Sequence, residues 1–213
     1  MFTYDADEDA VNLAAMTVRS EVWPQWLTIA RDELASARVA RDSNPGPIAD
    51  ASFDKALLYE YRSAMVCICA VAFMLEAFSN SVAVRYPSHS QATSPTAEGN
   101  QLSASARCHQ IWTSAFRLTN VNSANTKKTL EQIFKARNAA VHASAGFVDP
   151  VQHPVYQVAL EGRYVTYTVE NASSVYTAAI DALDHLLDHP RGGTAEWSAW
   201  CEAMRTRLGG IVS

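Results

Sequence analysis

The sequence predicts a mainly α-helical protein, an antiparallel helical bundle with an inserted β-hairpin and C-terminal helices. Apolar residues recur three and four positions apart in several long segments, as in helices that bury one face. Residues 65–75 are apolar on every side, which predicts a helix surrounded by other helices. The 213 residues, 48% of them hydrophobic, are enough for a substantial core, so we expect a single domain over residues 1–213.

The N-terminal part predicts helices in residues 1–42. Residues 5–22 are rich in alanine and begin with acidic side chains, which favour a helix N-terminus. Pro24 can open a second helix that ends near residue 42. Residues 43–52 then form a turn with Pro45, Gly46 and Pro47. A long helix over residues 53–84 follows as the centre of the bundle.

The middle of the chain predicts a loop and two more helices. Residues 86–105 are polar, contain two prolines and lack periodicity, so we expect a long loop that is functional or disordered. A short helix is predicted over residues 104–118, followed by a turn over residues 120–125. The next helix spans residues 126–145, with Thr126 as its N-cap and Gly146 as its stop.

Beyond this helix, residues 152–170 alternate and are rich in β-branched and aromatic side chains, which predicts a β-hairpin. Residues 173–208 predict two C-terminal helices, the first capped by Asn171 or Ser173. His185 and His189 are spaced to share a metal ion. No further committed ligand accompanies them, so a solvated helix face is the preferred interpretation and no metal or cofactor is expected.

Arg137 is the unusual residue of the helix over residues 126–145. It falls on that helix's apolar stripe, and His142 lies on a neighbouring polar strip with Asn138. An unpaired buried charge is costly, so the position of Arg137 on the apolar stripe requires an explanation. It could extend its charge to water, form an internal ion pair or belong to a site. Small neighbours favour a site, because a ligand could approach closely: Ala139, Ala140 and Ala143.

The run Arg137-Asn138-x-x-x-His142, late in a helix, resembles the R-x4-6-H motif of HEPN domains (higher eukaryote and prokaryote nucleotide-binding). The resemblance implies a HEPN-like core over residues 53–146. It also implies an acidic partner for Arg137 on the packed helix. Glu76 is the preferred candidate, and Glu60 and Asp54 are its competitors.

The same resemblance implies a metal-independent endoribonuclease with a site formed where the motif helices of two protomers meet. His142 would act as general acid and base, Arg137 would bind the scissile phosphate, and Asn138 would position either the histidine or the phosphate. The expected products have 2′,3′-cyclic phosphate and 5′-OH ends. Three lysines of this helix would supply a local basic groove for RNA: Lys127, Lys128 and Lys135.

HEPN proteins are widespread in toxin–antitoxin and host-defence systems. The implied role is therefore RNA cleavage by a toxin or host-defence protein, and the implied partner is an antitoxin or another regulatory protein. In one variant a tyrosine, modified with AMP, stands two residues after the histidine, where this chain has Ser144. Two alternatives stay open. One is a non-catalytic HEPN-like dimer that binds nucleotide, RNA or a partner protein. The other is an unrelated bundle, favoured if Arg137 and His142 point into separate surroundings.

The composition limits these functions. A net charge of −5 and a pI near 5.6 argue against broad electrostatic capture of nucleic acid, so RNA contacts must be local. The cysteines lack metal-ligand spacing and predict reduced core residues: Cys67, Cys69, Cys108 and Cys201. Residues 1–10 lack a signal-peptide core. The longest apolar run has 11 residues, against about 20 for a bilayer span. The expected location is cytoplasmic.

Overall fold

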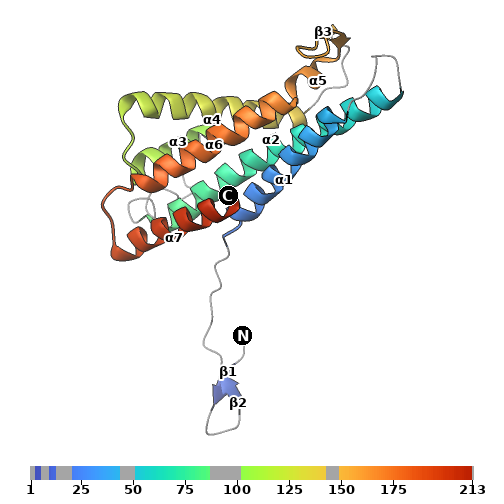
Figure 1. Ribbon diagram of the computed structural model, residues 1–213. Coiled ribbons are helices and arrows are strands. Elements are labelled where there is room, and N and C mark those ends of the chain that lie inside the picture. The colour runs from blue at the N-terminus through green and yellow to red at the C-terminus, as the bar shows by residue number, and fades with distance from the viewer. Residues whose placement is uncertain are drawn as a thin grey trace.

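The computed structural model describes residues 3–5, 10–12, 21–43, 51–86, 102–142 and 149–212. Helices dominate these residues, which confirms the mainly α fold class (Figure 1). The long helices are α1 Trp23–Asp42, α2 Ala51–Arg85, α3 Ala104–Ala115, α4 Asn120–Val141, α6 Val169–Asp188 and α7 Ala195–Val212. A short helix, α5 Gly162–Thr166, precedes α6.

Helix α2 is the centre of the bundle. It contacts α1, α3, α4 and α6, and its middle is buried among them (Figure 1). Phe78 is fully buried there, with four aromatic rings between 5.8 and 6.3 Å from its own: Trp23, Trp112, Phe116 and Trp200. By length and composition α2 could cross a membrane, but most of its apolar window is covered by the rest of the chain. That burial is typical of the central helix of a bundle.

The N-terminal helix expected over residues 5–22 is not found in the described residues. Strands β1 Thr3–Asp5 and β2 Ala10–Asn12 pair antiparallel instead. The second expected helix is present as α1, with Pro24 in its first turn, where a proline's missing N–H costs nothing. Of the predicted loop over residues 86–105, residues 87–101 lie outside the described chain.

Helix α4 begins six residues earlier than predicted. Residues 120–125, expected as a turn, are helical because Thr119 caps them: its hydroxyl accepts the backbone N–H of Asn122 at 3.2 Å. The helix ends at Val141 and His142 is its C-cap. The predicted stop at Gly146 lies outside the described residues.

The hairpin predicted over residues 152–170 is much shorter in the structure. Strands β3 Val151–Gln152 and β4 Ala159–Leu160 pair antiparallel, and the expected second strand is replaced by α5 and the start of α6. The aromatic residues that suggested a strand pack on α2 instead, since the rings of Tyr164 and Tyr167 lie 5.0 and 5.8 Å from that of Tyr61. Thr168 caps α6 by accepting the N–H of Asn171.

Candidate functional site

Helix α4 presents one face to the core and one to solvent. Leu130, Ile133 and Phe134 are buried against the bundle, as their three-four spacing predicts. The polar side chains singled out from the sequence are exposed on the other side: Lys127, Lys128, Lys135, Asn138 and His142. The lysines and the two motif residues are therefore accessible from solvent.

Arg137 lies between the two faces, with 19% of its side chain exposed. Its guanidinium carbon is 5.3 Å from the ring centre of Phe134 and 5.7 Å from that of Phe73, which stabilises a cation between two aromatic rings. Its Nε atom is buried and finds no hydrogen-bond partner among the described residues. This arginine is held in place by rings and keeps hydrogen-bond donors unused.

Glu76 of α2 is the acidic group beside Arg137. The Arg137 Nη2 and Glu76 Oε2 atoms are 4.0 Å apart, which is too long for a hydrogen bond. The other carboxylate oxygen, Oε1, accepts a hydrogen bond from Arg107 of α3. Glu76 is thus shared between two arginines and leaves the Arg137 donors open. The competitor Glu60 pairs with Arg41 instead.

Arg107 was not expected from the sequence to join this cluster. Its place depends on how α3 packs against α2, and no spacing within the chain reports that contact. The group of one carboxylate and two guanidinium groups carries a net positive charge beside the motif. That local charge fits an anionic ligand despite the acidic total of the chain.

His142 lies in different surroundings from Arg137. It is exposed at the C-terminus of α4, where its backbone N–H donates to the carbonyl oxygen of Asn138 at 2.9 Å. Arg137 instead points toward α2, against Phe73 and Glu76. Among the described residues, the guanidinium and the imidazole have no side-chain partner in common. Separate surroundings of this kind favour the alternative of a helical bundle unrelated to HEPN domains.

A small cavity of about 250 Å³ opens beside Asn138. It lies between the middle of α4 and the first turn of α3. Ser103 caps α3 by accepting the N–H of Ala106 at 3.2 Å, and its hydroxyl is 3.0 Å from that of Ser105. Four side chains of α4 form the other wall: Glu131, Phe134, Lys135 and Asn138.

The other candidates from the sequence, the histidine pair and the cysteines, offer fewer groups for binding or catalysis. The rings of His185 and His189 lie 4.4 Å apart, but no group of three or more metal-binding side chains occurs within the described ranges. The four cysteines are free thiols. Burial raises the pKa of Cys67 and of Cys201 to about 12 and that of Cys108 to about 11. Thiols with such pKa values are poor nucleophiles at neutral pH.

The cluster of Arg137, Asn138 and His142 with Glu76 and Arg107 is therefore the candidate site that combines charge, accessibility and unused hydrogen-bond donors. Its members come from α2, α3 and α4. The two main residues of the motif are Arg137 in α4 and His142, which is the C-cap of α4 and lies five residues later in the chain. Comparison with protein-family models, with curated proteins and with solved structures finds no match.

Proposed function

We propose that the protein is a metal-independent endoribonuclease of the HEPN type. The observation that carries the proposal is Arg137: a largely buried guanidinium whose Nε has no partner in the described chain and whose nearest carboxylate is 4.0 Å away. A buried arginine in this state is suited to an anionic ligand, because guanidinium and phosphate pair through charge-assisted hydrogen bonds. The motif resemblance supplies the reaction class.

In the proposed mechanism Arg137 binds the scissile phosphate and stabilises the negative charge that develops on its oxygens. His142, exposed to solvent, removes the proton of the 2′-OH or donates one to the 5′-oxygen that leaves. Histidine suits both steps because its ordinary pKa, about 6.5, gives both protonation states near neutral pH. Attack of the 2′-oxygen on phosphorus expels the 5′-oxygen and leaves a 2′,3′-cyclic phosphate.

A second copy of the chain completes the proposed site. The HEPN resemblance implies that groups from two motif helices act on one phosphodiester. A two-fold axis beside α4 would bring two arginines and two histidines together. The exposed Lys127, Lys128 and Lys135 of both chains would bind the flanking RNA backbone. By resemblance, the biological role is a toxin or host-defence ribonuclease, acting in the cytoplasm under the control of a regulator.

The test is cleavage of total RNA by the purified protein in excess EDTA, which removes free divalent metal ions. We expect the wild type to produce 2′,3′-cyclic phosphate ends and His142→Ala to lose the activity. His189→Ala is the matched control, because His189 is also an exposed histidine at the C-cap of a long helix. Equal activity of wild type and His142→Ala, or no cleavage by a folded wild-type dimer across several RNA classes, would refute the proposal.

One observation favours a second candidate, a non-catalytic helical dimer that binds nucleotide, RNA or a partner protein. Arg137 is packed between two rings beside Glu76 and apart from the surroundings of His142, as in an arginine that holds helices together. In that case His142→Ala would dissociate or unfold the protein. A nuclease would instead lose cleavage while keeping its oligomeric state, so size-exclusion chromatography of this variant separates the two candidates.

A further inference from the structure

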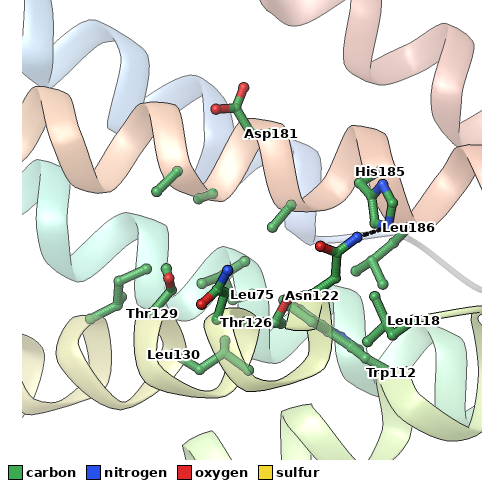
Figure 2. A pocket seen from close by; sticks show the side chains of 15 residues that line it. Leu75, Trp112, Leu118, Asn122, Thr126, Thr129, Leu130, Asp181, His185 and Leu186 are labelled. Atoms are coloured by element: carbon green, nitrogen blue, oxygen red, sulfur yellow. Dashed lines mark hydrogen bonds between the residues drawn. The ribbon is translucent and has the colours of Figure 1, made fainter. Parts of the chain in front are cut away.

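A second cavity lies between α4 and α6, lined on the α4 side by residues of its N-terminal half (Figure 2). Its volume is about 470 Å³, which is within the range of small-molecule sites. Its floor consists of apolar side chains that are buried or nearly buried. They come from all four surrounding helices: Leu75 of α2, Trp112 of α3, Leu130 and Ile133 of α4, and Leu186 of α6.

The α4 wall of this cavity is polar, and the α6 wall is largely alanine: Ala178, Ala179 and Ala182. Asn122 reaches across from α4, and its Nδ2 atom lies 3.3 Å from Nε2 of His185 on α6, which closes one end (Figure 2). Asn125, Thr126 and Thr129 line the α4 side. Within the part of the chain that the structure describes, these three side chains make no hydrogen bond. Amides and hydroxyls can both donate and accept, so they can pair with either kind of ligand group.

The charges of the residues that line the cavity favour a neutral ligand over an anionic one. Asp181 is the only formal charge among the described residues that line the cavity, and its carboxylate is directed away from α4 (Figure 2). An anionic ligand would find no lysine or arginine to pair with among these residues, which disfavours it. A neutral molecule meets no such penalty.

From these observations we infer that the cavity is a binding site for a small, neutral aromatic molecule that carries an amide-like group. Its flat apolar face would lie against Leu118, Ala178 and Ala182, the lining residues whose apolar side chains are partly exposed. Its amide edge would exchange hydrogen bonds with Asn125, Thr126 and Thr129. The α4 residues that line the site all precede Arg137 in the chain, and the inference does not depend on ribonuclease activity.

Benzamide and benzoate are suitable probes, because they have nearly the same shape and differ in charge. We would titrate each into the ¹⁵N-labelled full chain and follow the side-chain amide signals of Asn122 and Asn125 by NMR. We expect saturable shifts with benzamide, with a Kd on the order of 1 mM for so small a ligand. Benzoate should bind at least about tenfold more weakly.

A matched pair of variants locates the site. Ala178→Phe fills the cavity, since Ala178 lines it from α6, and should abolish benzamide binding. Thr177→Phe adds the same ring at an exposed neighbouring position of α6 outside the lining and should leave binding unchanged. Circular dichroism verifies that both variants fold. Absence of saturable benzamide binding to the wild type, equal binding of benzoate, or retained binding in a folded Ala178→Phe variant would overturn the inference.

Discussion

Replacing Arg137 by methionine distinguishes an arginine kept for a ligand from one kept for stability. The change removes the loose 4.0 Å approach to Glu76, worth about 0–1 kcal/mol. It also removes two arginine–ring contacts, worth roughly 0.5–1 kcal/mol each at partly exposed sites. Methionine restores sulfur–ring contacts of about 0.3–1.5 kcal/mol. We therefore expect Arg137→Met to lower the free energy of unfolding by only about 1 kcal/mol.

Arg41→Met is the matched comparison within the same chain. Arg41 forms hydrogen bonds to both carboxylate oxygens of Glu60 and to Glu170, and Glu60 is only 1% exposed. Removing this guanidinium leaves a buried carboxylate without its counter-charge. Breaking such a pair costs about 3–5 kcal/mol, several times the loss expected at Arg137.

Urea unfolding of the wild type and the two variants measures both free energies directly. With slopes of about 1–3 kcal/mol per M, Arg41→Met should lower the midpoint by more than about 1 M, and Arg137→Met should lower it far less. The Arg137→Met protein should stay folded and lose RNA binding. If Arg137→Met lost as much stability as Arg41→Met, Arg137 would be a structural residue. The proposal that it is kept for a ligand would then be wrong.

Two further predictions concern stability. Burial lowers the pKa of His153, so the unfolded chain binds more protons than the folded chain just below the ordinary histidine pKa of about 6.5. Stability should therefore fall as the pH drops below about 6.5, by up to about 1.4 kcal/mol per pH unit. His153→Asn should flatten this dependence in thermal melts, and an unchanged slope would contradict the assignment. Phe78→Ala, at the centre of the aromatic cluster, should cost about 3–5 kcal/mol. Val84→Ala, on an exposed face of the same helix, should change the unfolding free energy by no more than about 0.5 kcal/mol, and similar losses in the two variants would contradict the described core.

The elements that were predicted well are those whose signal is local. The apolar run of α2 and the three-four pattern of α4, α6 and α7 follow from side-chain period alone, so the mainly helical fold could be read from the sequence. The HEPN resemblance pointed to Glu76 as the acidic neighbour of Arg137, and the two side chains lie 4.0 Å apart.

The elements that were missed depend on contacts between distant parts of the chain. Residues 120–125 look like a turn, but this part of α4 is held by Thr119 and by contacts from His109 and His185 to Ser123 and Asn122. The aromatic segment at residues 164–169 has strand-like composition. It forms the end of α5, a break at Tyr167 and Thr168, and the start of α6. Its rings pack on α2, and the Tyr167 hydroxyl donates to the Ala136 carbonyl at 2.8 Å. Such tertiary contacts override local propensity.

The candidate site residues could be named from the sequence, but their arrangement in space could not. Arg137, Asn138 and His142 were singled out by motif, and the exposure of Asn138 and His142 follows from helical period. The placement of Arg107 on Glu76 and the different surroundings of Arg137 and His142 required the packing of α2, α3 and α4. The proposal that the ribonuclease site lies between two chains comes from the HEPN resemblance.

The central claim is that Arg137 and His142 of two chains act on one phosphodiester. It is tested most directly by mixing protomers: Arg137→Met and His142→Ala chains are purified separately, unfolded together and refolded, and RNA cleavage is measured in EDTA. Each variant alone should be inactive, and the mixture should recover part of the wild-type activity, because mixed dimers hold one intact arginine and one intact histidine. An inactive mixture that contains mixed dimers, beside an active wild type refolded in the same way, would contradict the shared site.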